Sequence, residues 1–261
     1  MEIAQHVTAI EQEAHLFADA ARRSELDAVI ATCPGWDMRD LVRHLAEIHL
    51  CAAAQVSNRA AKMWVKDLCE LSAYWPDLAL FWPSDDELID WYLQTNANLV
   101  RELTSAPLDL RCRTFLPASS PLAMWARRQA HETAVHRFDA EHAGHTGTSF
   151  EPGFAADGID ELLVAFATRG STFAIGSPGR IVVHTNDTDD RWHVTGVTTT
   201  RGEGPCDVTI TGSASALYLT LWNRSDHSTI TVTGNRDLLD TWRNGHRIRW
   251  SRAHLTKERT D

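Results

Sequence analysis

The chain has 261 residues, 43% of them hydrophobic and 23% charged, a composition typical of a globular protein with one large domain or two small ones. It has no apolar run long enough to span a membrane, and its N-terminal stretch is charged where a signal peptide needs an apolar core, so we expect a cytoplasmic protein that does not bind membranes. The net charge of −10 argues against a nucleic-acid partner and favours a small-molecule ligand.

The first part of the chain predicts four helices, of which two precede residue 63. Residues 2 to 24 place apolar side chains near a 3.6-residue period, which indicates an amphipathic helix. The second helix is expected to begin after Asp37, because this residue resembles an N-cap and Asp40 supplies an acidic first turn. It is expected to run to about residue 62, with His44 on its inner face.

The third and fourth helices have clear N-terminal signals. The third is expected to start at Ser84 or Asp85. The fourth begins with Ser120 as cap and Pro121 at the first helical position, where proline has no amide hydrogen to leave unsatisfied. Gly144 marks its end.

The long connection between the second and third helices is rich in tryptophan. A connection of this length is usually functional or carries short structure of its own. Its large aromatic side chains either form the wall of a substrate pocket or pack into the core. The residues concerned are Trp64, Trp75 and Trp82.

Beyond Gly144 the composition shifts towards β-branched residues separated by Gly, Asn and Asp, as in a small α+β domain. We therefore predict a helical domain over residues 1–148 and an α+β domain over residues 149–261. The elements expected in the second domain are helices at 156–169, 214–222 and 236–242, and strands at 180–184, 192–197, 207–211 and 229–233.

Three polar residues of the helical domain form a candidate metal site. Glu132 and His136 are four residues apart on one helix, so their side chains lie one above the other and can bind a single ion. His44 would complete a three-ligand site with an open position. Two His and one Glu are typical of catalytic zinc, whereas structural zinc usually has four ligands rich in Cys. At each position the alternative is a polar side chain satisfied within the core.

Residues close to these three were also considered. His49 and His131 lie off the inward stripe and are expected on a flank or at the surface. Asp139 follows His136 by three residues and is suited to accept a hydrogen bond from the second nitrogen of that imidazole. A surface salt bridge with a nearby arginine is the alternative for Asp139.

The five cysteines are odd in number and show no C-x-x-C spacing. This pattern fits neither a disulfide framework nor a cysteine zinc site, so we expect reduced and mostly packed thiols. They are Cys33, Cys51, Cys69, Cys112 and Cys206.

Several segments together resemble the mycothiol-dependent maleylpyruvate isomerase family, over essentially the whole chain. In the helical part the resemblance rests on Cys33–Asp37, Leu41–Ala46, Trp125–Arg127 and Glu132–Glu141. In the second part it rests on Asp157–Leu163, Leu219–Arg224 and Ile230–Gly234.

The resemblance implies a DinB-like four-helix bundle followed by a domain similar to sterol carrier proteins. It further implies a divalent metal, usually zinc, bound by the residues that correspond to His44, Glu132 and His136. An arginine of the second domain is implicated in the family's isomerases, and Arg224 fits it best, as a clamp for a substrate carboxylate. Here the segment reads Leu-Trp-Asn-Arg where the family usually has Leu-Trp-Gly-Arg, so an ordinary helix-end arginine remains the alternative.

The main functional hypothesis is a zinc-dependent S-transferase that activates mycothiol as a thiolate and adds it to a small electrophile. A mycothiol-dependent cis-trans isomerase would use the same site. A zinc hydrolase and a non-catalytic metal-binding module are the alternatives from other classes. Nickel or manganese would also suit ligands without cysteine. The acceptor and the oligomeric state are not specified by the sequence, although a monomer is compatible with it.

Overall fold

The computed structural model describes residues 1–59, 61, 83–144, 146–167, 179–196 and 198–245. Two compact units are present: a helical unit, mainly Glu2–Thr114 and Ala118–Thr148, and an α+β unit, mainly Ser149–Arg249. The predicted fold class, a helical part followed by an α+β part, is confirmed. Trp64, Trp75 and Trp82 lie outside the described residues.

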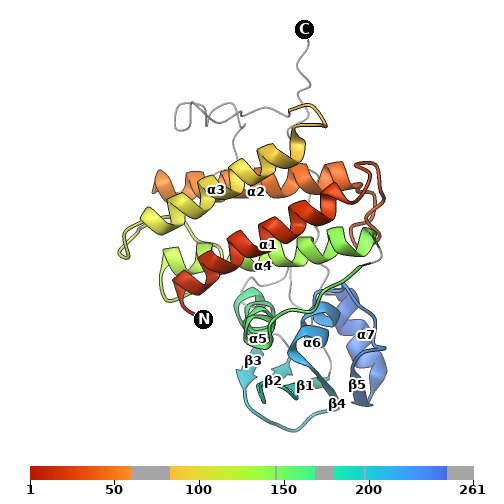
Figure 1. The fold of residues 1–261 in the computed structure, drawn as a ribbon. Helices are drawn as coiled ribbons and strands as arrows, with labels where there is room; N and C mark the ends of the chain where they lie inside the picture. Colours follow the sequence, from red (N-terminus) through yellow and green to blue (C-terminus); the bar gives the residue numbers. More distant parts are fainter. Residues whose placement is uncertain (60, 62–82, 145, 168–178, 197, 246–261) are drawn as a thin grey trace. The chain divides into compact units, whose positions relative to one another are not determined.

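Among the described residues, four long helices form the helical unit. Within it α1 packs against α3 and α4, and α2 packs against α3 and α4 (Figure 1). Each of the four helices contributes buried apolar side chains to the core. The helices are α1 (Ile3–Arg22), α2 (Met38–Ser57), α3 (Leu88–Ser105) and α4 (Pro121–Ala143).

The predicted N-terminal signals of α2 and α4 are confirmed. The Asp37 carboxylate accepts from the Asp40 N–H at 2.8 Å, and Asp40 accepts from the Asp37 N–H in return, which makes a capping box. In α4 the Ser120 hydroxyl accepts from the Ala123 N–H at 3.1 Å, with Pro121 in the first turn. Both helices therefore begin where the sequence predicts. These starting points fix the positions of His44 and Glu132 along the axes of their helices.

Two helix ends differ from expectation. Helix α2 stops at Ser57 because Asn58 turns its side chain back to the Ala54 carbonyl, and Arg59 adopts a left-handed φ of 48°. Helix α3 begins at Leu88 because Ser84 forms a turn first, in which its hydroxyl donates to the Glu87 carboxylate at 2.9 Å.

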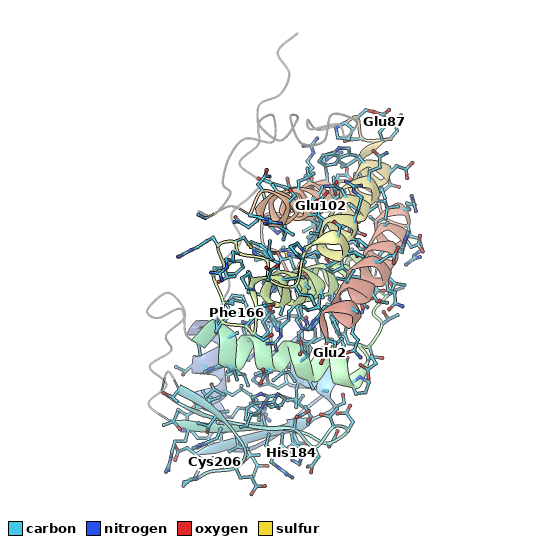
Figure 2. The ribbon with its side chains drawn as sticks, turned by 90° about the vertical axis from the view of Figure 1, so that its left-hand side faces the viewer. Glu2, Glu87, Glu102, Phe166, His184 and Cys206 are labelled. Carbon is cyan, nitrogen blue, oxygen red and sulfur yellow. The ribbon has the colours of Figure 1, made fainter. Side chains whose placement is uncertain are left out.

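The α+β unit is built on a five-stranded mixed sheet with the order β3-β2-β1-β4-β5. Only β1 and β4 are parallel; the other neighbours are antiparallel. The strands are β1 (Arg180–Thr185), β2 (Arg191–Thr195), β3 (Thr198–Arg201), β4 (Val208–Gly212) and β5 (Thr231–Gly234). His184 lies on strand β1 of the sheet, and Cys206 lies just before strand β4 (Figure 2).

The helices of this unit precede and interrupt the sheet, as expected, and α5 packs against α6. Helix α5 starts four residues earlier than predicted, because the Glu151 carboxylate accepts from the N–H groups of Gly153 and Phe154. The elements are α5 (Pro152–Asp160), the π-helical turn η2 (Glu161–Ala165), α6 (Ala214–Leu221) and α7 (Arg236–Gly245). Among the described residues, no helix combines the length and apolar composition needed to cross a membrane.

Candidate metal centre

Helix α4 has no exposed face over most of its length, and this is what places charged side chains in the interior. Glu132 is 2% exposed and His136 is 0% exposed. Burial of a carboxylate is costly unless hydrogen bonds or an opposite charge compensate it. The contacts of these two side chains therefore decide whether the arrangement is stable.

The structure brings the three predicted ligands together. His44 Nε2, from α2, lies 3.3 Å from Glu132 Oε1, and His136 Nε2 lies 3.5 Å from the same oxygen. One candidate ligand atom from each of the three residues lies within 4.8 Å of the others. A single ion placed among them would be within reach of all three after small side-chain adjustments.

Asp139 accepts a hydrogen bond from His136, as the spacing predicts. His136 Nδ1 is 2.8 Å from Asp139 Oδ2, and the Asp139 side chain is buried rather than at the surface. Because Nδ1–H donates to this carboxylate, a neutral His136 presents the lone pair of Nε2 towards Glu132. The contact fixes both the tautomer and the orientation of the ring.

Arg128 holds the other oxygen of Glu132, a contact that the sequence analysis did not anticipate. Its Nη2 donates to Glu132 Oε2 at 2.7 Å, and both side chains are buried. Oε2 is therefore engaged by the guanidinium, and Oε1 is directed at the two imidazoles. The spacing of four residues on one helix is the available sequence signal, but it is common among surface ion pairs as well.

The electrostatics of the cluster follow from these contacts. Burial opposes ionisation of Glu132, but Arg128 and the hydrogen bonds from His136 and His44 outweigh it and hold the pKa of this carboxyl well below its usual range. Burial also opposes protonation of His136, yet Asp139, Cys33 and Glu132 raise the pKa of its ring well above the usual value. Burial lowers the pKa of His44. In the absence of a metal ion, a proton on His136 Nε2 takes the position facing Glu132.

A tight loop before α2 packs against both imidazoles. The Trp36 ring lies 4.8 Å from the His44 ring and 6.4 Å from the His136 ring, nearly parallel to the latter. The loop is closed by hydrogen bonds from Trp36 N–H to the Cys33 carbonyl and from Ile30 N–H to the Trp36 carbonyl, both 3.0 Å. Gly35 has φ of 85°, a left-handed conformation that favours glycine.

The expectation that His49 and His131 lie on a flank or at the surface is wrong. His49 is fully buried. Its Nε2 forms a hydrogen bond with Thr133 Oγ1 at 3.0 Å, and its ring stacks on Tyr92. The His131 ring contacts His6 edge-on. Most residues of α4 are buried, whichever way round the helix they point. A side chain that lies off the face carrying Glu132 and His136 is therefore not exposed to solvent on that account.

Arg224 belongs to the α+β unit and follows α6. Its Nη1 donates to the Trp222 carbonyl at 3.0 Å. Helix α6 ends in a Schellman motif, in which Arg224 N–H bonds to the Leu219 carbonyl and Asn223 N–H to the Thr220 carbonyl.

The residue before Arg224 occupies the position of that motif that usually holds glycine. Asn223 has φ of 61°, and asparagine tolerates this left-handed conformation better than most residues. The replacement of Gly by Asn therefore preserves the local backbone that carries Arg224. The role of this arginine stays a prediction.

Known families and structures match both parts of the chain. The family described as Mycothiol maleylpyruvate isomerase N-terminal domain matches residues 7–141, and the MDMPI C-terminal domain matches residues 153–241. The first match alone covers more than half of the chain.

Two solved structures are similar over most of their length. The crystal structure of a point mutant of the mycothiol-dependent maleylpyruvate isomerase has a TM-score of 0.62 at 15% identity and covers 90% of this chain and 95% of its own. The crystal structure of the mycothiol-dependent maleylpyruvate isomerase itself has a TM-score of 0.59 at 16% identity with the same coverage. At such identities these likenesses establish the fold alone. No curated protein sequence matches significantly.

Proposed function

Because the chain belongs to the mycothiol maleylpyruvate isomerase family, we propose that it uses the thiol of mycothiol to isomerise a small unsaturated acid from cis to trans. The observation that carries the proposal is the convergence of His44, Glu132 and His136 on one point in the helical unit. The family match favours isomerisation over the S-transfer that the sequence analysis put first.

The residues present fit a divalent metal ion. With Nδ1–H of His136 donating to Asp139, the Nε2 lone pair and Glu132 Oε1 face each other at 3.5 Å. Two electron-rich atoms at this separation repel each other unless a proton or a metal cation lies between them, and a divalent ion can replace the proton that His136 Nε2 otherwise carries. Two imidazoles and one carboxylate are a ligand set that suits zinc and leaves one coordination position for another molecule.

The buried charge supports an anionic fourth ligand. Counted over Glu132, Asp139 and Arg128, with neutral histidines, the cluster carries one net negative charge. A divalent ion would change this to one positive charge, and a thiolate would then neutralise it. A neutral ligand would leave the buried charge uncompensated.

When bound, a divalent ion would lower the pKa of a thiol that coordinates it, so that a thiolate is available at neutral pH. Addition of this thiolate to a conjugated double bond converts the bond to a single bond, about which the substrate rotates. Loss of the thiolate then restores the double bond in the trans configuration. The thiol is regenerated, and the composition of the substrate is unchanged.

The residues of this chain have separate tasks in the proposal. Arg128 and Asp139 hold Glu132 and His136 in the orientation given above. Arg224 would bind a carboxylate of the acid substrate through its planar set of donors. In this structure Nη1 of Arg224 donates to the Trp222 carbonyl at 3.0 Å.

The test is to incubate zinc-loaded protein with maleylpyruvate, with and without mycothiol, and to follow the products by proton NMR and mass spectrometry. The proposal predicts a trans isomer of unchanged mass that forms only when the thiol is present. A stable thiol adduct would instead indicate S-transfer, and thiol-independent hydrolysis of ester or amide substrates would indicate a hydrolase. Either of these results without isomerisation contradicts the proposal.

The Arg224 assignment has its own control. Arg224→Lys keeps the charge but loses the planar pair of donors, so it should slow turnover of the acidic substrate while zinc binding is unchanged. Arg243→Lys, in the same unit, is the matched control, because Arg243 donates to the Thr220 carbonyl and has no proposed substrate contact. Equal turnover of Arg224→Lys and wild type would show that Arg224 does not bind the substrate.

A further inference from the structure

The thiol of Cys33 lies at the candidate metal centre, although no part of the proposed chemistry uses it. Cys33 is 8% exposed, and its Sγ donates to Asp139 Oδ2 at 3.4 Å. The same oxygen accepts from His136 Nδ1 at 2.8 Å. One carboxylate oxygen therefore receives two hydrogen bonds, one from a ligand imidazole and one from a thiol.

The thiol contacts the carboxylate oxygen that also pairs with His136 Nδ1. Cys33, Asp139 and His136 form one group of possible ligand atoms, and His44, Glu132 and His136 form another, so only His136 is common to the two. The two ring nitrogens of an imidazole point in different directions, and here Nε2 faces Glu132 while Nδ1 faces Asp139. Cys33 is thus placed to act on the ligand through Asp139 rather than to bind the same ion.

The backbone around Cys33 keeps the thiol in this position. Cys33 N–H donates to the Ile30 carbonyl and its own carbonyl accepts from Trp36 N–H, both at 3.0 Å. A β-bridge between Val29 and Asp37 closes the loop at its base. A side chain can orient another group only if it is itself held in place. The closed loop holds the Cys33 thiol in this way.

We propose that Cys33 is a positioning residue for the metal centre: its thiol, by donating to Asp139 Oδ2, fixes the carboxylate that orients His136. The expected consequence, tighter metal binding, rests on the proposed function. The hydrogen bond from Cys33 to Asp139 does not depend on it. Loss of an outer-shell partner typically weakens metal affinity about 10- to 100-fold, and a step further from the ion should give roughly the lower end of that range.

The experiment compares Cys33→Ser, which keeps a hydrogen-bond donor, with Cys33→Ala and Cys33→Val, which remove it with and without loss of volume. Zinc dissociation constants are measured by competition with a chromogenic chelator. The expected result is a roughly tenfold weaker affinity for the Ala and Val variants and an affinity within about twofold of wild type for Ser. Cys51→Ala, on α2 and in neither group of possible ligand atoms, is the matched control and should bind zinc like wild type.

A second readout keeps the inference separate from the proposed function. In metal-free protein labelled with 15N-histidine, the Nδ1–H resonance of His136 reports its bond to Asp139. It should move in Cys33→Ala and Cys33→Val and return towards the wild-type position in Cys33→Ser. If wild type binds no zinc, the proposed function fails, and this resonance still tests Cys33.

Three results would overturn the inference. An unmoved His136 resonance in the Ala and Val variants would show that the thiol does not act on Asp139. Equal effects of Ser and Val, on the resonance or on zinc affinity, would show that the position serves packing alone. A sulfur-to-metal charge-transfer band in cobalt-loaded wild type without added thiol would show instead that Cys33 is itself a ligand.

Discussion

The arginines of helix α4 and those of the β-sheet are paired differently. In the helical unit Arg128 and Arg137 are 2% and 1% exposed and pair with carboxylates that are buried or nearly so. In the α+β unit the side chains of Arg180 and Arg201 are 45% and 51% exposed. Exposed pairs contribute little to stability, whereas buried charge is costly to leave unpaired. The difference teaches that the polar residues of α4 form a mutually dependent set, in which each removal leaves another charge without its partner.

The largest expected effect on stability comes from substitution of Arg137. Its side chain donates to Glu13 at 2.7 Å and to Glu141 at 2.7 Å. Burial already raises the pKa of Glu13 against the influence of this arginine. Arg137→Met should lower the free energy of unfolding by about 3–5 kcal/mol, because two carboxylates lose their partner. Urea unfolding followed by circular dichroism at 222 nm measures it.

Arg180→Met is the matched control for this prediction. Arg180 pairs with Asp207 at 2.9 Å, and both side chains are partly exposed. No change beyond experimental error is expected, because water solvates both charges in either state. Equal destabilisation by the two substitutions would refute the contrast between the units.

Arg128→Met gives the next effect and links the contrast to the metal. Removal of the guanidinium leaves Glu132 buried without its cation, so the metal-free protein should be less stable than wild type by about 3 kcal/mol. A divalent ion would supply part of the missing positive charge. The rise in Tm on addition of zinc should therefore be larger in Arg128→Met than in wild type, and an equal or smaller rise contradicts the proposed position of the ion.

A smaller effect is expected at Asn223 in the α+β unit. Its φ of 61° is left-handed, a conformation that costs most L-residues about 1–2 kcal/mol. Both Asn223→Ala and Asn223→Gly lose the hydrogen bond from the Asn223 side chain to the Arg243 carbonyl, but glycine adopts the left-handed conformation without strain, so the Ala variant should be less stable than the Gly variant by about 1 kcal/mol. Thermal unfolding of the two variants checks this order, and a Gly variant less stable than the Ala variant would contradict the Schellman assignment.

The smallest effect concerns pH and Glu47, on α2. Burial raises the pKa of this carboxyl from 4.5 to about 7. Between these values the folded protein holds a proton that the unfolded chain releases, so this group makes the free energy of unfolding fall as pH rises through the window. Glu47→Gln should remove that slope and stabilise the protein more at about pH 8 than at about pH 5. The free energy of unfolding is measured by urea unfolding at each pH. If its dependence on pH is the same in Glu47→Gln as in wild type, the buried Glu47 carboxyl is not the cause of that dependence.

Local sequence signals predicted most of the fold. Asp37 and Ser120 cap their own helices through neighbours three residues away, so three-residue patterns suffice to find these helix starts. Strand β3 was not predicted, because Thr198–Arg201 is a polar run without the alternation that marks a buried face. It is a strand because it pairs with β2 at the edge of the sheet, a contact that sequence spacing does not reveal.

The candidate site was predictable only in part. The spacing of Glu132 and His136 indicated a shared metal ion, the inner face of the second helix added His44, and the family resemblance pointed to the same three residues. Cys33 was expected only to pack, because its contact with Asp139 joins residues 106 positions apart. Neither periodicity nor local motifs report such a contact, and the burial of α4 likewise depends on residues distant in the sequence, such as those of α1.

The most direct test of the central claim is the zinc content of His136→Ala and wild type, measured by elemental analysis after loading and desalting. We predict about one ion per chain in wild type and almost none in the variant, with helical content at 222 nm retained because the bundle core supplies most of the stability. Full zinc occupancy in His136→Ala, or no zinc in wild type, would contradict a metal centre built on His44, Glu132 and His136.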